Sequence, residues 1–180
     1  IICNIQDTAT LEPELIARSP DSLYLLQNRL RDYAITHYDY TLIDCPPNIG
    51  TFVLIALTAS DFAIVPIIAS SAFSIEGLVK AIYLVGDINR DYNPNLRFLK
   101  LLVNRMSKRT IVSQAIVSQL HSSFGAEKVF KTTIPVNTAL EKAELQHKTI
   151  FQFDQTATSA RAFRDLAKEL DNLISAEYHI

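Results

Sequence analysis

Residues 38–50 read Tyr38-Asp39-Tyr40-Thr41-Leu42-Ile43-Asp44-Cys45-Pro46-Pro47-Asn48-Ile49-Gly50, a short β-rich segment followed by a stiff turn. Tyr40 to Ile43 predicts a strand, because aromatic and β-branched side chains favour the pleated conformation and the two prolines forbid its continuation. A strand here delivers Asp44 at its carboxyl end, the position of an aspartate that holds Mg²⁺ beside a nucleotide. An aspartate that only caps the turn occupies the same place, so the run alone leaves both interpretations open.

Strand-like and helix-like segments alternate on either side of this run. Apolar runs predict strands at residues 15–17, 40–43, 62–67, 98–103 and 129–134. Helical spacing of apolar residues predicts helices at 22–34, 51–59, 74–89, 111–123 and 163–176. The last helix is expected to turn Phe163, Leu166, Leu170, Leu173 and Ile174 inward. Strands alternating with helices predict an α/β fold with a mostly parallel sheet and helices on both faces.

Length and composition fit one domain over residues 1–180, with residues 1–14 as an irregular or helical lead-in. The formal net charge is -2, so any contact with nucleic acid requires a local basic patch. Cys3 and Cys45 show no disulfide or zinc spacing, which fits a reducing cytoplasm. No apolar run is long enough to span a bilayer. The chain begins at Ile1 without an initiator Met, which indicates an internal fragment.

Other reactive residues form no recognisable site. His37, His121, His147 and His179 are scattered without metal-ligand spacing, so ordinary surface or core histidines are expected. No serine lies in a Gly-x-Ser-x-Gly elbow, which argues against a serine hydrolase. The charge of Asp44 disfavours the thiolate of its neighbour Cys45. Phe151 and Phe153 suit core packing better than a contact with a base.

The run at residues 38–50 resembles the Walker B and switch II segment of the ParA/MinD family of ATPases. Further segments resemble parts of that family in the same order: Asp61 to Pro66, Phe73 to Leu78, Leu102 to Arg105, Lys108 to Thr110, Phe130 to Asn137, Leu140 to Ala143, Ile150 to Asp154 and Ala160 to Leu170. Each motif is weak, but the ordered series from about Leu15 to the end is strong. Arg109-Thr110 and Thr133-Ile134-Pro135 favour ParA over MinD.

The resemblance implies a P-loop NTPase-like fold and assigns roles to particular residues. Asp44 is implied as the Walker B aspartate that acts on Mg²⁺ and water, and the implied nucleotide-binding residues are Asp44, Pro46, Asn104, Pro135 and Asn137. The implied DNA-binding residues are Arg105, Lys108, Arg109 and Lys131. The family works as an ATP- and Mg²⁺-dependent homodimer in the bacterial cytoplasm, on the nucleoid and not on a membrane. It binds DNA non-specifically, segregates plasmids or chromosomes, and is stimulated by a ParB-type centromere-binding protein.

The chain departs from the family in two places. Its four glycines, Gly50, Gly77, Gly86 and Gly125, lie outside any glycine-rich loop with a Gly-Lys-Ser/Thr, and that loop cradles the phosphates. We therefore expect the carboxyl-terminal two-thirds of a ParA-type domain, truncated at its N-terminus, inactive in ATP hydrolysis by itself, and self-associating through an exposed strand edge. Residues 136–140 lack a basic residue that many ParA proteins carry there, so Arg105, Lys108 and Arg109 also suit a merely solvated turn.

Two other interpretations stay open. The first is a non-catalytic, truncated paralogue that dimerises or binds a partner without handling nucleotide. The second is a related P-loop synthetase or a MinD-like membrane ATPase. Glu169, Asp171 and Glu177 offset Lys168 in the last helix, which argues against a membrane-binding face.

Overall fold

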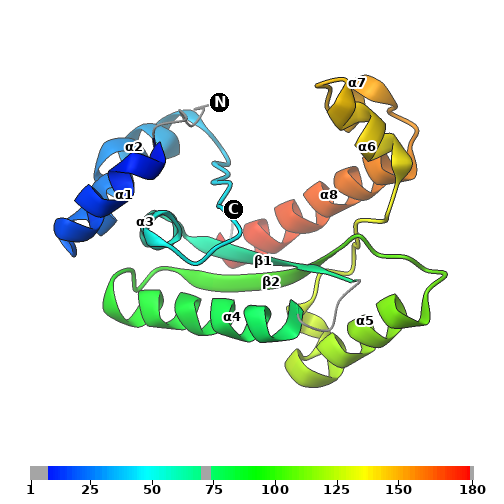
Figure 1. The fold of residues 1–180 in the computed structure, drawn as a ribbon, viewed down its shortest axis with the longest axis horizontal. Helices are drawn as coiled ribbons and strands as arrows, with labels where there is room; N and C mark the ends of the chain where they lie inside the picture. Colours follow the sequence, from blue (N-terminus) through cyan, green and yellow to red (C-terminus); the bar gives the residue numbers. More distant parts are fainter. Residues whose placement is uncertain (1–7, 70–73, 179–180) are drawn as a thin grey trace. The chain divides into compact units, whose positions relative to one another are not determined.

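The computed structural model describes residues 8–69 and 74–178 (Figure 1). Its elements are α1 (Thr8–Ala17), η1 (Asp21–Tyr24), α2 (Leu25–His37), α3 (Thr51–Ala59), β1 (Phe62–Ile68), α4 (Ser74–Asp91), β2 (Arg97–Asn104), α5 (Ile111–Phe124), η2 (Ala126–Lys128), α6 (Thr138–Leu145), α7 (Ile150–Phe153) and α8 (Thr158–Tyr178). The chain divides into a first unit, residues 1–63 with 80–98, and a second unit, residues 64–79 with 99–180. Residues 1–7 of the expected lead-in, and with them Cys3, lie outside the described residues, as do Ser70, Ser71 and His179.

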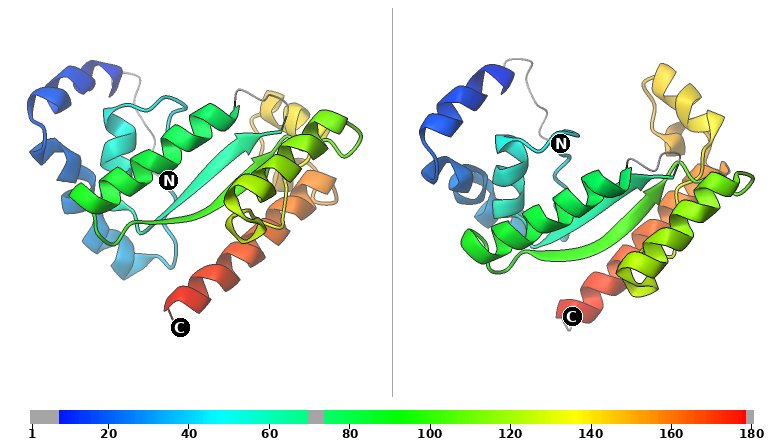
Figure 2. Two further views of the ribbon diagram at one scale, coloured as in Figure 1. Left: turned by 90° about the horizontal axis from the view of Figure 1, so that it is seen from below. Right: turned by 60° about the horizontal axis from the view of Figure 1, so that its bottom comes forward.

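The strands β1 and β2 pair in parallel, and both views of Figure 2 show them side by side. Near their starts the backbone N–H of Arg97 donates to the carbonyl of Asp61 at 2.8 Å, and near their ends the N–H of Ala69 donates to the carbonyl of Asn104 at 3.0 Å. The helix α4 connects the two strands. The predicted α/β class, with a parallel sheet flanked by helices, is therefore confirmed.

The predicted strand at 129–134 is only partly formed. The segment lies parallel to β2, with a bridge between Leu101 and Val129 and hydrogen bonds from the N–H of Phe130 to Leu101 (2.9 Å) and from Ile134 to Val103 (2.9 Å). Four residue steps on the segment thus match two on β2, so the residues between bulge out of the ladder. The predicted parallel direction is right, and the predicted regular strand is wrong.

Two other predicted strands are absent. Residues 15–17 are the last turn of α1. Residues 40–43 are irregular, and Leu42 is 82% exposed. High β-propensity describes side chains that fit between paired strands, but among the described residues the sheet consists of β1 and β2 only. The predicted strand at 40–43 is wrong in this structure for that reason.

The predicted helices are confirmed, with shifts of up to five residues at their ends. The helix α3 has the predicted bounds, and the predicted helix at 22–34 is divided between η1 and α2. In α8, Leu166, Leu170, Leu173 and Ile174 are half-buried as expected, whereas Phe163 is exposed, which corrects that prediction. The helices α6 and α7 were not predicted.

Each unit has its own core. In the first unit Ala63, Val85, Ile88 and Leu96 pack together, with Leu54, Leu57 and Phe98 against them. The buried Asn93 closes this core, because its amide nitrogen donates to the carbonyls of Leu57 (3.2 Å) and Ser60 (2.7 Å). In the second unit Ala143, Ile150, Ala157 and Ala160 form a cluster between α6, α7 and α8.

Candidate functional site

The loop that leaves β2 meets the segment that precedes α6. The N–H of Met106 donates to the carbonyl of Ile134 at 2.9 Å, and the N–H of Val136 donates to the carbonyl of Met106 at 3.1 Å. Met106 and Pro135 form a parallel bridge. The structure therefore brings three of the implied nucleotide-binding residues, Asn104, Pro135 and Asn137, into one neighbourhood at the carboxyl end of β2, where parallel α/β sheets bind ligands.

The side chain of Asn104 supports the turn that follows β2. Its Oδ1 accepts the backbone N–H of Arg105 at 2.8 Å. Arg105 has a φ of 53°, in the left-handed region that non-glycine residues rarely adopt. The hydrogen bond to Asn104 helps to hold this unfavourable backbone conformation. The Arg105 side chain is exposed.

The side chain of Asn137 is engaged at both ends. Its Oδ1 accepts the N–H of Ala139 at 2.8 Å and so caps α6. Its Nδ2 donates to the hydroxyl of Thr158, the first residue of α8, at 2.7 Å. Asn137 therefore joins two helices, and a contact from this side chain to a base would require one of these bonds to break.

Arg105, Lys108 and Arg109 are exposed in the loop between β2 and α5. Among the described residues, no carboxylate lies within ion-pair distance of any of the three. The buried hydroxyl of Ser113 fixes the end of this loop, because it donates to the carbonyl of Ala69 at 2.7 Å and accepts from Thr110 Oγ1 at 2.9 Å. Free cations on a fixed loop suit contacts with phosphate groups.

Lys131 lies at the other end of the segment that reaches Pro135. Its side chain is exposed and has no hydrogen-bond or ion-pair partner among the described residues. Its backbone N–H and that of Thr132 donate to the two carboxylate oxygens of Glu169 on α8, at 2.8 and 2.9 Å. Sequence reasoning did not identify Glu169, because no local pattern links this carboxylate to residues so far away in the chain.

Asp44 and Pro46 belong to the first unit, where both are exposed in the irregular segment before α3. The pKa of the neighbouring Cys45 thiol is raised, first by burial of the sulfur and second by the charge of Asp44. The second cause agrees with the prediction that the charge of Asp44 disfavours the thiolate. The part of the chain that the structure describes contains no group of three or more His, Cys, Asp or Glu side chains arranged for a metal ion.

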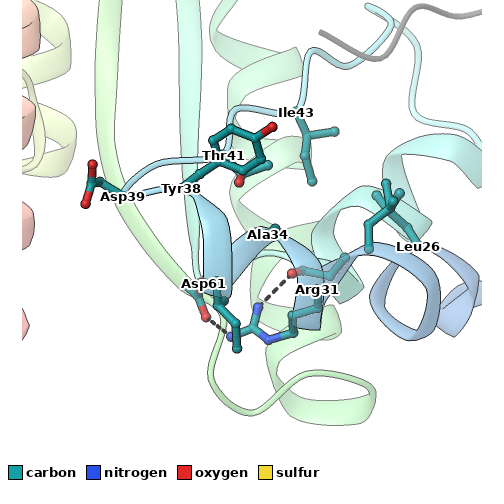
Figure 3. A pocket seen from close by; sticks show the side chains of 11 residues that line it. Leu26, Arg31, Ala34, Tyr38, Asp39, Thr41, Ile43 and Asp61 are labelled. Carbon is teal, nitrogen blue, oxygen red and sulfur yellow. Dashed lines mark hydrogen bonds and ion pairs between the residues drawn. The ribbon is translucent and has the colours of Figure 1, made fainter.

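A small pocket of about 160 Å³, not anticipated from the sequence, opens in the first unit between α2 and the 38–43 segment (Figure 3). Its wall is mostly apolar, with Leu26, Ala34 and Ile43 among the lining residues. At one side the guanidinium of Arg31 donates to the carbonyl of Ala59 at 2.9 Å and pairs with Asp61 at 2.6 Å. The described helices include none that is long and apolar enough to cross a membrane.

Comparison with known proteins places these features in a family. A family model described as an AAA domain matches residues 1–98. The chromosome-partitioning ATPase Soj of Thermus thermophilus is 37% identical over 145 residues, which are 81% of this chain and 56% of that protein. The sporulation initiation inhibitor protein Soj of Bacillus subtilis is 33% identical over 134 residues, or 74% of this chain and 52% of that protein.

Solved structures agree with this placement. The apo McdA of Cyanthece superposes with a TM-score of 0.75 over 90% of this chain and 64% of its own, and its 16% identity makes this a likeness of fold. The cobyrinic acid a,c-diamide synthase of Mycobacterium smegmatis with bound ATP analog and magnesium has a TM-score of 0.65 at 26% identity, over 73% of this chain and 51% of its own.

The chain is thus an α/β domain of the class of P-loop NTPases. The AAA-domain model matches more than half of its length. Within that class it belongs to the ParA family. The chain spans a little over half the length of the Soj proteins that it matches, 56% and 52%.

Proposed function

We propose that this chain works in a ParA-type partition ATPase that segregates plasmid or chromosomal DNA. The observation that carries the proposal is the meeting of the 104–110 loop with Ile134 to Asn137 at the carboxyl end of β2. The likeness to the Soj of Thermus thermophilus supports it from the sequence. The proposed setting is the bacterial cytoplasm, on the nucleoid, as a homodimer that a ParB-type centromere-binding protein stimulates.

In the proposed nucleotide site, Asp44 would hold Mg²⁺ with its exposed carboxylate, a ligand type that this ion prefers. The other proposed nucleotide-binding residues are Pro46 in the first unit and Asn104, Pro135 and Asn137 in the second. Because the Asn104 and Asn137 side chains already stabilise local turns, the base contacts fall to Pro135 and to backbone groups. When bound, Mg²⁺ would offset the negative charge that develops on the transferred phosphoryl group.

These 180 residues contain no glycine-rich loop with a Gly-Lys-Ser/Thr to cradle the phosphates. Positioning by such a loop supplies most of the catalysis in phosphoryl transfer. We therefore expect no ATP hydrolysis from these residues alone. Titration with a fluorescent ATP analogue checks this: micromolar, Mg²⁺-dependent binding that Asp44→Ala abolishes would reveal a phosphate site elsewhere in the chain.

For DNA, the proposed contacts are Arg105, Lys108, Arg109 and Lys131. Fluorescence polarisation of a labelled duplex of random sequence tests them between 50 and 200 mM salt. Each phosphate contact steepens the dependence of log K on log salt by about 0.9, so Lys108→Ala and Arg109→Ala are each expected to lower the slope by about that amount. Lys80→Ala, an exposed lysine on α4, is the matched control. Equal effects of Lys80→Ala and Arg109→Ala would exclude the loop as the DNA site.

A second candidate is a non-catalytic module that dimerises or binds a partner. It is favoured by the exposed apolar side chains before α3, where Tyr38 is 59%, Tyr40 45% and Leu42 82% exposed. Light scattering over a range of concentrations tests it. A mass that rises with concentration, and falls in Leu42→Ser, supports association through this segment.

A further inference from the structure

We propose that α8 acts as a brace for residues 105–109, which we call the basic loop. Glu169 and Thr158 on α8 are the positioning residues, and they hold the two ends of the 131–137 segment, which in turn contacts the basic loop. The inference rests on the proposed DNA-binding role of the 105–109 loop. Every contact in it lies within the second unit.

The first contact between α8 and the segment is made by the carboxylate of Glu169. Its two oxygens accept the N–H groups of Lys131 (2.8 Å) and Thr132 (2.9 Å), two successive residues of the bulge beside β2. A regular strand would use only one of two successive N–H groups toward a given neighbour. The bulge leaves both of these N–H groups without a carbonyl on β2, and Glu169 supplies an acceptor for each.

The second contact is made by the hydroxyl of Thr158, which accepts a hydrogen bond from Nδ2 of Asn137 at 2.7 Å. The two contacts lie 11 residues apart on α8, from Thr158 to Glu169, which corresponds to a rise of about 16 Å at about 1.5 Å per residue. The helix and the segment run in opposite directions, and each end of one contacts an end of the other.

The braced segment then holds the basic loop. Ile134 and Val136, inside the segment, form the two backbone hydrogen bonds to Met106. Met106 lies between Arg105 and Lys108, whose exposed side chains are the proposed phosphate contacts. A shift of the segment therefore moves the backbone from which these cations project.

The alternative is that apolar packing alone fixes the segment, since Phe130 and Ile134 are each 2% exposed. Amide hydrogen exchange on the full 180-residue chain separates the two. If α8 braces the loop, Glu169→Ala and Glu169→Gln accelerate exchange at Lys131 and Thr132 and also, by about tenfold, at Met106 and Val136. Acceleration confined to Lys131 and Thr132 overturns the proposal, because the contact with Glu169 would then affect only these two residues and not the basic loop.

DNA binding supplies the second measurement, with controls matched for charge. Glu169→Gln and Asp165→Asn each remove one negative charge from α8, and the Asp165 side chain is exposed. Lost charge alone tightens DNA binding equally in both variants. A brace predicts instead that Glu169→Gln weakens binding several-fold while Asp165→Asn does not. Equal affinities for the two variants would refute the brace.

Thr158 gives a test without any change of charge. Thr158→Ser keeps the hydroxyl that Asn137 needs, whereas Thr158→Val keeps the shape and loses the acceptor. For the serine variant we expect wild-type exchange at Met106 and wild-type DNA affinity. For the valine variant we expect faster exchange at Met106 and weaker DNA binding. If the wild-type chain does not bind DNA, the proposed function fails, while exchange at Met106 still decides whether α8 braces the loop.

Discussion

Arg31 on α2 and Asp61, the residue before β1, form an ion pair with an Nη2 to Oδ1 distance of 2.6 Å. The second guanidinium nitrogen of Arg31 donates to the carbonyl of Ala59, the last residue of α3, at 2.9 Å. One side chain thus joins α2 to the end of α3 and to the start of the sheet. It does so at one side of the pocket that Figure 3 draws.

Arg31→Ala is expected to lower the free energy of unfolding by about 1–2 kcal/mol, since it removes a charged hydrogen bond to a carbonyl and an ion pair that solvent partly screens. Arg31→Lys keeps the charge but not the two-pronged geometry, so an intermediate loss is expected. Urea unfolding at pH 7 measures both. In a double-mutant cycle with Asp61→Asn, a coupling free energy near zero would contradict the pairing.

The backbone at His147 predicts a stabilising substitution. Its φ is 52°, and it follows α6 in a Schellman arrangement, with the N–H of His147 donating to Glu144 and that of Lys148 to Ala143, both at 2.9 Å. Glycine adopts this conformation without strain. We expect His147→Gly to raise the free energy of unfolding by about 0.5–1 kcal/mol, and thermal or urea unfolding measures it.

Asparagine tolerates the left-handed region better than most residues, so His147→Asn is expected to fall between wild type and His147→Gly. His147→Ala is the control, because it removes the ring and leaves the backbone strain in place. A gain for His147→Ala as large as for His147→Gly would show that the ring, and not the backbone, is the source of the strain.

Helix bounds were the best predicted part of the fold, and they show what local sequence determines. The helix α3 is an apolar run between Gly50 and Ser60, so both ends are marked locally. The helix α7 carried a usable signal that was missed, because Thr149 and Gln152 form a capping box. Such signals act within one turn of helix and need no tertiary partner.

Strands were predicted less well, because a strand exists only when another strand pairs with it. Residues 40–43 have the composition of a strand and no partner strand among the described residues, whereas 62–67 and 98–103 pair with each other. The candidate site follows the same rule. The family resemblance already implied that Asn104 and Pro135 serve one site, but the role of Glu169 depends on a helix whose position no local pattern gives.

The reactivity of the Cys45 thiol is expected to depend on the charge of Asp44. Because burial first and Asp44 second raise the pKa of its thiol, a smaller fraction is thiolate near pH 8 than in a free cysteine. In a Cys3→Ser background, iodoacetamide is expected to modify Cys45 slowly, and Asp44→Asn to accelerate the reaction by about threefold. Asp39→Asn, in the same exposed segment, is the control. Equal rates for the two variants would show that proximity to Asp44 has no influence on the thiol.

Glu169 predicts how acid acts on the second unit. Burial raises the pKa of its carboxyl, but the hydrogen bonds from Lys131 and Thr132 and the charge of Lys100 outweigh burial, and the pKa is lowered from 4.5. A lowered pKa in the folded state means that the ionised carboxylate stabilises the fold at all pH values above about 4.5, and that this contribution is lost as pH falls through the folded pKa.

Glu169→Gln removes the charge and one of the two acceptors. It is therefore expected to be less stable than wild type at pH 7, by on the order of 1 kcal/mol, and to approach wild type as the pH falls below 4.5 and through the lowered pKa of the folded state. Urea unfolding followed by circular dichroism from pH 7 to pH 3 measures the difference. Asp165→Asn on the same helix serves as the control. A stability difference between Glu169→Gln and wild type that stays constant across this range would mean that the carboxylate is not the ionised acceptor of the Lys131 and Thr132 N–H groups. Another interaction would then have to hold the segment against α8.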